Sequence, residues 1–295
     1  MLRADDGDEG DLQIALVTGS ATAMPVPDPE SHLLVAALAE RGVRAALVPW
    51  DDDRDWSQVP LVLCRTPWDY VGRADEFLAW ARSTGAATRL LNPAGLIGWN
   101  LHKRYLAELL ERGLPVVPTT VLRHDASASA RTAALAVDGD VVIKPAISGG
   151  AMGTVRVAAR TDGARDHLAG LLRDGEALVQ PYLPEVEDGE VSLVLFAGEL
   201  SHAVRKQPAA GDFRVQEEHG GVVLPHEPTP DEVAVARRVL EALPWPSTYA
   251  RIDLVTTADG PLLMEAELIE PELFLRAVPV AAGRFADVLV ADLRG

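Results

Sequence analysis

The first hundred residues alternate short apolar runs with amphipathic stretches. Aliphatic runs that are too short for helices predict strands, and stretches with apolar residues three or four positions apart predict helices. The strands are expected at residues 12–19, 44–50, 59–64 and 88–92, and the helices between them at 31–42 and 74–85. This alternation is typical of an α/β fold, so we predict an open, doubly wound parallel sheet.

The rest of the chain predicts a mixture of strands and helices typical of α+β lobes. A helix is expected to begin at Leu101. It should end at Gly113, because glycine readily takes the left-handed conformation that ends a helix. Further strands are expected at residues 115–122, 140–145, 153–159, 177–183, 189–198, 200–206, 250–257 and 262–268, and further helices at 163–174 and 230–243. We therefore expect domains at 1–100, 101–184 and 185–295, with residues 1–11 as a disordered tail.

The charge of the chain limits its partners. Its 44 Asp and Glu residues against 27 Lys and Arg give a formal net charge of −17, which argues against a nucleic acid or an anionic membrane as the main partner. The N-terminus is acidic, unlike a signal peptide, and no apolar run is long enough to span a membrane. We expect a cytoplasmic protein whose partner is a small molecule. The single cysteine, Cys64, is interpreted as a core residue.

The segment "VVIKPAISGGAMGT" places Lys144 at the end of an apolar strand, directly before a glycine-rich loop. A lysine there either extends to solvent from an edge strand or binds an anion. Gly149 and Gly150 favour the second interpretation, because glycines let backbone N–H groups approach a phosphate and let a flap move. Neither a G-x-G-x-x-G motif after the first strand nor a P-loop motif is present, so another kind of phosphate site is needed.

The segment "VQPYLPEVEDGE" offers a surface for a flat base. Tyr182 and Leu183 follow an apolar strand, and Glu190 lies within reach of ribose hydroxyls. The alternative is a simple hinge that Pro181 and Pro184 stiffen.

Two predicted strands carry carboxylates that point to one face. Glu265 and Glu267 are two positions apart, and antiparallel pairing brings Asp253 beside them. Such oxygen ligands suit Mg²⁺, whereas the alternative is a solvated strand face. Lys206 and Arg214 follow on another strand and its loop, where they either contact a transferring phosphoryl group or are ordinary surface cations.

The order of these segments resembles the ATP-grasp superfamily, near bacterial glutathione synthetase and related carboxylate–amine ligases. The resemblance covers residues from about 90 to 280 and implies ATP and Mg²⁺ as cofactors. It implies an ATP-grasp fold with an N-terminal parallel-sheet domain on the substrate side, a mobile central lid and a C-terminal lobe with the metal site. The residues that it places at ATP are Lys103, Lys144, Ser148, Gly149, Gly150, Gln180, Tyr182, Leu183 and Glu190. The metal ligands would be Asp253, Glu265 and Glu267, with Lys206 and Arg214 catalytic.

Two positions depart from the superfamily pattern. Glu267 stands where Asn is frequent among the metal ligands, and Ser192 stands where a basic residue is frequent two positions after the ribose carboxylate. These changes add negative charge at the metal and remove positive charge near the phosphate, so they place greater demand on Lys206 and Arg214.

The segments "CRTPWDY", "NLHKRYLAEL", "SHAVRKQPAAGDFRVQ" and "MEAELIEPELF" are similar to a small group of enzymes that includes the O-ureido-serine cyclo-ligase, which forms cycloserine, and sister enzymes of unknown substrate. The resemblance implies that a substrate carboxylate becomes an acyl phosphate, which a nitrogen of the same molecule attacks, as in the cyclisation of O-ureido-D-serine to D-cycloserine during antibiotic biosynthesis. It also places Arg65, Trp68, Tyr70 and Glu270 around the substrate. An intermolecular amino-acid ligase and a non-catalytic nucleotide-binding protein are the alternatives, and a homodimer is plausible.

Overall fold

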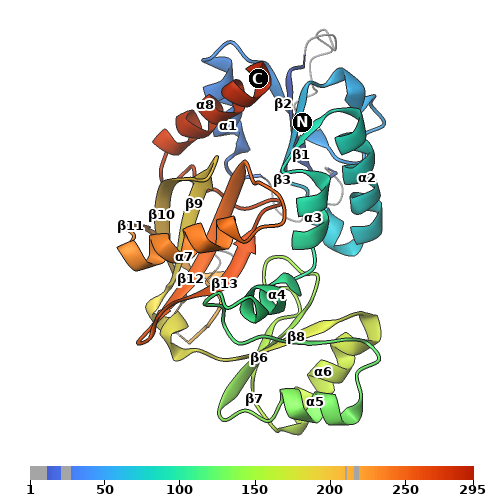
Figure 1. Ribbon diagram of the computed structural model, residues 1–295, viewed down its shortest axis with the longest axis vertical. Coiled ribbons are helices and arrows are strands. Elements are labelled where there is room, and N and C mark those ends of the chain that lie inside the picture. Colours follow the sequence, from blue (N-terminus) through green and yellow to red (C-terminus); the bar gives the residue numbers. More distant parts are fainter. Residues whose placement is uncertain (1–11, 21–27, 210, 216–218) are drawn as a thin grey trace.

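The computed structural model describes residues 12–20, 28–209, 211–215 and 219–295. They include three sheets that follow one another along the long axis of the molecule (Figure 1). The segment 1–11, for which we predict a disordered tail, lies outside the described residues.

The N-terminal sheet is parallel throughout, as predicted. Its strand order is β2-β1-β3-β4, with bounds β1 Ile14–Thr18, β2 Ala45–Pro49, β3 Leu61–Thr66 and β4 Arg89–Leu91. Successive side chains of β1 are buried on opposite faces: Leu16 packs toward α1 (Ser31–Ala39) and α8 (Val280–Arg294), and Val17 packs toward α2 (Ala74–Ala87). Because helices cover both faces, the strands are nearly continuous apolar runs.

The C-terminal sheet is antiparallel and lies in the middle of the molecule (Figure 1). Its strand order is β11-β10-β9-β12-β13, with bounds β9 Glu190–Phe196, β10 Glu199–Gln207, β11 Val222–His226, β12 Tyr249–Thr257 and β13 Gly260–Glu267. Apolar side chains of α4 (Tyr105–Glu111) and α7 (Pro230–Glu241) pack on one face. The helix α7 begins with a capping box between Thr229 and Glu232.

The third sheet, which we call the lid sheet, lies at the far end from α8 (Figure 1). Its strand order is β5-β8-β6-β7, with bounds β5 Thr120–Leu122, β6 Asp140–Pro145, β7 Val155–Ala158 and β8 Ala177–Pro181. The helices α5 (Ala128–Ala134) and α6 (Asp162–Asp174) pack against it around a separate apolar core. The lid sheet and its two helices therefore have a hydrophobic core of their own, separate from the cores beside the other two sheets.

Some elements differ from the sequence predictions. The helix expected from Leu101 begins only at Tyr105, because the N–H of Lys103 donates to the carbonyl of Ala146 and holds residues 101–104 in a turn. A separate helix, α3 (Ala94–Asn100), precedes this turn. The strand expected at 115–122 is reduced to β5, since prolines at 115 and 118 cannot donate ladder hydrogen bonds. The elements α5, α8 and β11 were not predicted.

Three short 3₁₀ turns lie within the described residues. They are η2 (Trp56–Gln58), η3 (Trp68–Gly72) and η4 (Pro184–Asp188). Among the described residues, no helix combines the length and the apolar character needed to cross a bilayer.

Candidate active site

A cavity of about 680 Å³ lies between the lid sheet and the C-terminal sheet, and η3 of the N-terminal region contributes to its wall. Every site residue predicted from the sequence lines this cavity except Asp253 and Arg65. The lining residues from that set are Trp68, Tyr70, Lys103, Lys144, Ser148, Gly149, Gly150, Gln180, Tyr182, Leu183, Glu190, Lys206, Arg214, Glu265, Glu267 and Glu270. Segments that are far apart in the sequence thus meet in one place.

The lysines of the chain are confined to this cavity. The sequence contains only three, Lys103, Lys144 and Lys206, and all three line it, whereas most of the described arginines lie elsewhere. Lysine carries a compact charge whose pKa responds strongly to burial. Burial and the neighbouring charge of Lys103 lower the pKa of Lys144 to about 7. Burial also lowers the pKa of Lys103, although nearby glutamates oppose that effect. An anion bound beside Lys144 would favour the charged form of this lysine.

The loop after β6 contains glycines that no other residue can replace without strain. Gly150 has a φ of 55° and Gly153 a φ of 70°. A Cβ atom added at Gly153 would lie 2.9 Å from the side chain of Pro145, so the loop returns close to its own origin. The flap, residues 148–153, lines the cavity mainly with small residues, together with Met152.

The segment after β8 forms another wall. Gln180 donates to the hydroxyl of Thr119 at 2.8 Å, which fixes its side chain. The ring of Tyr182 lies beneath the guanidinium of Arg156, with 3.6 Å between the Arg156 Cζ atom and the ring centroid. Glu190 follows at the start of β9 and forms an ion pair with Lys206. Burial raises the pKa of Glu190, while Lys206 opposes the shift.

The carboxylates on β12 and β13 have the register expected from the sequence. Asp253 pairs with Glu265, and Arg251 pairs with Glu267, so the four side chains point to one face of the sheet. Each carboxylate has a cationic partner: Arg251 bonds to Asp253 at 2.9 Å and contacts Glu267, and Lys103 contacts Glu265. Asp253 also accepts from Ser192 at 2.6 Å and from Lys206 at 3.3 Å.

These pairings set the charge state of the sheet face. Burial raises the pKa of Asp253, but Arg251 and Lys206 outweigh it and hold that pKa well below its usual range. Within the described ranges, no group of three His, Cys, Asp or Glu side chains is arranged to hold a metal ion. The reason is that each carboxylate turns toward a cation. Asp253 is only 2% exposed and lies beneath the cavity wall.

Glu270 and Tyr70 meet across the cavity from different parts of the chain. The Tyr70 hydroxyl, on η3, donates to the Glu270 carboxylate, which follows β13, at 2.7 Å. Burial and the nearby charge of Glu267 raise the pKa of Glu270 to about 7, although the hydrogen bond from Tyr70 lowers it in part. Trp68 lies beside Tyr70 on the cavity wall. The N-terminal region therefore contributes polar and aromatic groups to the end of the cavity near Glu270.

Arg65 does not reach the cavity. Its side chain is fully buried in β3 and pairs with Glu30 at 3.2 Å. The carboxylate that Arg65 binds thus belongs to the protein, and a direct role at the substrate, which we expected from the sequence, does not follow from this position.

Arg214 lies on the cavity wall but is turned toward its own loop. Its Nη2 atom donates to Asp212 at 2.7 Å, and this pair raises the pKa of Arg214. Both side chains are partly exposed, so the pair can open at a small cost in free energy.

Arg251 is the main residue that the sequence interpretation missed. It lies two positions before Asp253 in the segment "ARIDLV", so the spacing argument that grouped Glu265 with Glu267 also places it on the same face. Met264, Phe213 and Phe274 also line the cavity, but their apolar character gave no signal beyond that of core residues.

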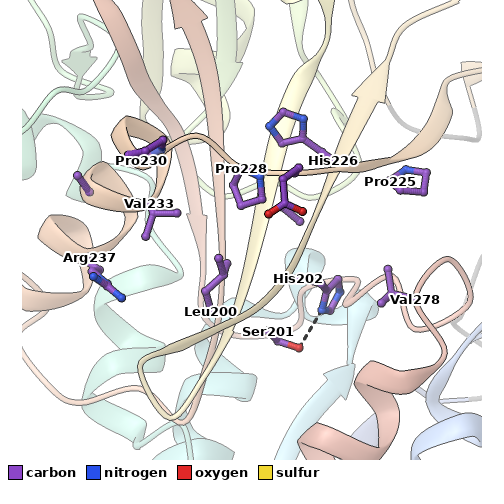
Figure 2. Close-up of a pocket in the computed structure, with 13 residues that line it drawn as sticks. Leu200, Ser201, His202, Pro225, His226, Pro228, Pro230, Val233, Arg237 and Val278 are labelled. Carbon is purple, nitrogen blue, oxygen red and sulfur yellow. Dashed lines mark hydrogen bonds between the residues drawn. The ribbon is translucent and has the colours of Figure 1, made fainter.

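A second cavity, of about 710 Å³, lies beside β10, β11 and the start of α7 (Figure 2). Prolines and aliphatic side chains form most of its wall, together with His202 and His226. His226 contacts Glu232 at 2.9 Å, and His202 contacts the backbone carbonyl of Leu273 at 2.8 Å. None of the predicted site residues lines this cavity.

Comparison with known proteins identifies the class. Residues 111–257 match the family model of the prokaryotic glutathione synthetase ATP-grasp domain, and residues 14–92 match that of the N-terminal domain of D-cycloserine synthetase DcsG. The chain has a TM-score of 0.71 with a D-alanine–D-alanine ligase from Bacillus anthracis at 15% identity, covering 96% of this chain and 97% of that one, which shows the shared fold. The fold and the cavity define an ATP-dependent ligase of the ATP-grasp class.

Within that class, the chain belongs to the family of the cycloserine biosynthesis protein DcsG. It is 35% identical to DcsG of Streptomyces lavendulae, over 95% of this chain and 99% of the relative. The crystal structure of D-cycloserine synthetase DcsG has a TM-score of 0.84 at 34% identity and covers 95% of this chain and 99% of that one. A glutathione synthetase from Prochlorococcus marinus (strain MIT 9313) is 32% identical over 74% of this chain and 70% of the relative.

Proposed function

We propose that the protein cyclises O-ureido-D-serine to D-cycloserine with the cleavage of ATP to ADP and phosphate. The observation that carries this proposal is the composition of the cavity: residues from the region similar to the ATP-grasp domain line it together with Trp68 and Tyr70, which lie in the region similar to the DcsG N-terminal domain. Both the region similar to the DcsG N-terminal domain and the region similar to the ATP-grasp domain therefore support this proposal.

ATP is assigned to the half of the cavity between the lid sheet and the C-terminal sheet. Lys103 and Lys144 would bind its phosphates, because both are buried lysines that line this part of the cavity. The flap would cover the phosphates with backbone N–H groups from Ser148, Gly149 and Gly150. Gln180, Tyr182 and Leu183 would hold the base, and Glu190 would bind the ribose hydroxyls.

Glu265, Glu267 and Asp253 are the residues that would hold Mg²⁺. Their oxygens are the donor type that Mg²⁺ prefers, and the first two line the same cavity as the lysines. When phosphates attract Lys103, Glu265 loses its cationic partner, and a divalent cation is a suitable replacement. Bound there, Mg²⁺ would offset the negative charge of the phosphates.

The reaction requires activation of a carboxylate, which is a poor electrophile. The substrate carboxylate oxygen attacks the γ-phosphorus of ATP, so that ADP leaves and an acyl phosphate forms. The ureido nitrogen that is bonded to oxygen then attacks the acyl carbon, the five-membered ring closes, and phosphate leaves with the bonding electrons. Hydrolysis removes the carbamoyl group to give cycloserine. Ring closure is favoured because both reacting groups belong to one molecule.

The protein supplies charge and exclusion of water. Arg251 and Lys206 line the cavity and would supply positive charge to the transferring phosphoryl group, and Arg214 can join them once its pair with Asp212 opens. Glu270 and Tyr70 would bind the substrate amino group, since a carboxylate that already accepts a hydrogen bond has capacity for a further donor. Closure of the flap would protect the acyl phosphate from water.

The decisive experiment measures ADP release and product mass with Mg-ATP and O-ureido-D-serine, its L-enantiomer, or pairs of amino acids. A cyclic product from the ureido compound alone supports the proposal. A linear product from two amino acids would assign the protein to intermolecular ligation, and ATP binding without turnover on any substrate would overturn ligase activity on these compounds. Glu265→Gln should abolish turnover, whereas the exposed Glu199→Gln on β10 serves as the matched control.

A further inference from the structure

The segment Pro271–Leu275, which we call the clamped loop, has no regular secondary structure, yet it is almost entirely buried. Buried backbone groups need hydrogen-bond partners. Although the Phe274 carbonyl accepts from the backbone N–H groups of Ala277 and Val278, most of the partners in this loop are side chains from distant parts of the chain. The bonds are Arg65 to the Pro271 carbonyl (3.1 Å), Arg251 to the Glu272 carbonyl (3.2 Å), His202 with the Leu273 carbonyl (2.8 Å), and the N–H groups of Leu273 (2.6 Å) and Leu275 (2.7 Å) to Glu30.

Glu30 and Arg65 provide three of these bonds and also bind each other. Glu30 directly precedes α1, and Arg65 lies on β3, so both belong to the N-terminal region, whereas the clamped loop follows β13. Their side chains are 2% and 0% exposed, and the pair is 3.2 Å long. A buried ion pair of this kind gives little net stability compared with apolar residues of the same size. What distinguishes the pair of Glu30 and Arg65 is its geometry, because its three hydrogen bonds fix the position of the loop backbone.

The clamped loop also contains a strained residue. Phe274 is buried and has a φ of 53°, in the left-handed region that bulky residues avoid. Such a conformation persists only where the surroundings impose it. Glu30 accepts from the N–H groups of Leu273 and Leu275, on either side of Phe274, and these bonds supply that constraint.

The clamped loop and its neighbours form one wall of the cavity. Glu270, Glu272, Phe274 and Arg276 all line it. The ring of Phe274 lies 5.5 Å from the Arg251 guanidinium, and Glu270 accepts the bond from Tyr70. A shift of the loop backbone would therefore move the substrate half of the cavity but not Lys144 or the flap.

We propose that Glu30 and Arg65 are positioning residues of the ligase reaction, which hold the clamped loop so that the Glu270 carboxylate meets Tyr70 in the substrate half of the cavity. Neither residue touches the substrate. The choice of substrate in the test depends on the proposed function, whereas the clamp itself does not. Arg65 thus acts on the site through the loop rather than by direct contact.

The test separates amino-acid binding from ATP binding in Arg65→Lys and Glu30→Gln. We expect either variant to raise KM for O-ureido-D-serine by about tenfold or more, because small displacements of a positioning group have large effects. The dissociation constant of ATP should stay within about twofold. The matched control is Arg41→Lys: Arg41 links α1 to α8 through Asp287 (2.7 Å) and the Gly283 carbonyl (2.9 Å), away from the cavity. This control should leave both constants within about twofold.

A double-mutant cycle with Glu270→Gln shows whether Arg65 acts through Glu270. If it does, Arg65→Lys should lower kcat/KM in the native background by about tenfold and have almost no further effect in the Glu270→Gln background. Additive losses, or equal losses in ATP affinity and in amino-acid affinity, would overturn the proposal, since they indicate a general structural role.

Hydrogen exchange of the clamped loop tests directly whether Glu30 holds the loop backbone, and it does not depend on enzyme turnover. In a folded variant, the Leu273 and Leu275 amides should exchange faster in Glu30→Gln than in the native protein, while Gln180 and its neighbours stay unchanged. Unchanged exchange at both leucines would overturn the clamp. If the native protein does not turn over O-ureido-D-serine, the proposed function fails, but this measurement and the ATP titration still decide the clamp. If Arg65→Lys does not fold, Glu30→Gln carries the test alone.

Discussion

Arg65 and Arg251 are both buried arginines on strands, and both donate to a carboxylate and to the backbone of the clamped loop. Arg65 is sealed: its side chain is fully covered and, within the part of the chain that the structure describes, its carboxylate partner is Glu30. Arg251 lies on the cavity wall and shares its charge between Asp253 and Glu267.

The difference shows how the surroundings of a charge decide its use. A sealed pair has no access to a ligand, so it can serve only the geometry of the protein. A pair on a cavity wall can exchange a protein partner for a ligand partner, because water and substrate reach it. Arg251 is therefore suited to chemistry and Arg65 to position, although the sequence presents both as arginines near apolar residues.

The largest expected effect comes from truncation of the two arginines. Arg251→Ala and Arg65→Ala should each lower the free energy of unfolding by about 3–5 kcal/mol, since each removes the cation of a buried ion pair. In folded protein at low temperature, only Arg251→Ala should also reduce ATP-dependent phosphoryl transfer, by about a hundredfold or more. Urea unfolding and ADP release measure the two effects. Equal losses of phosphoryl transfer in both variants would break the comparison.

The next effect concerns the affinity for ATP. Lys144→Met should weaken ATP binding by roughly 10- to 100-fold, because a charged hydrogen bond to phosphate contributes about 1.5–3 kcal/mol. Titration calorimetry measures it. The variant Arg104→Met, which changes an exposed cation close in sequence to Lys103, is the control and should bind ATP normally. Normal affinity in Lys144→Met would remove this lysine from the phosphate site.

The affinity for ATP should also depend on pH through Lys144. Burial and Lys103 lower its pKa to about 7 in the free protein, whereas a bound phosphate favours the charged form. ATP binding should therefore take up a proton above pH 7, and the affinity should fall as pH rises, by up to about tenfold per unit. Calorimetry in buffers of different ionisation enthalpy measures the proton uptake. Lys144→Met should abolish it; an unchanged uptake would assign the proton to another group.

The smallest effect is expected at Tyr70. Tyr70→Phe removes one hydrogen bond and should lower kcat/KM for the amino-acid substrate by about tenfold or less. Burial and Glu267 raise the pKa of Glu270 to about 7, and the Tyr70 hydroxyl partly opposes them. Its removal should raise that pKa further. If ionised Glu270 binds the substrate, the acidic limb of the kcat/KM profile should therefore move to higher pH. If the acidic limb does not move, its pKa belongs to a group other than Glu270.

The sequence predicted the parts of the fold that local pattern determines. The parallel strands were evident because helices cover both faces of the sheet, which makes each strand continuously apolar. The pairing of Asp253 with Glu265 followed from the two-residue period of strands. The start of α4 was predicted four residues too early, because the bond from Lys103 to Ala146 joins segments distant in the chain.

Site residues were harder to assign where the partner is remote. Lys144 and Glu270 line the cavity as the sequence suggested, but their roles stay predictions. Nothing near Arg65 in the chain indicates that Glu30 neutralises it, since the contact arises only when β3 packs beside the start of α1. The convergence of carboxylates was inferred without Arg251, whose charge draws Asp253 and Glu267 to itself. The proposed boundaries at residues 100 and 184 also stay predictions.

The restriction of lysine to one cavity has a consequence for chemical labelling. Acylating reagents modify neutral amines, and a lysine with a pKa of about 7 is substantially neutral at physiological pH. In this chain such a reagent has no lysine side chain to consume outside the cavity, so side-chain labelling of the folded protein should report on the occupancy of that cavity. If the reagent forms a single adduct at Lys144 and ATP prevents its formation, an amine-directed reagent would serve as an affinity label for this cavity.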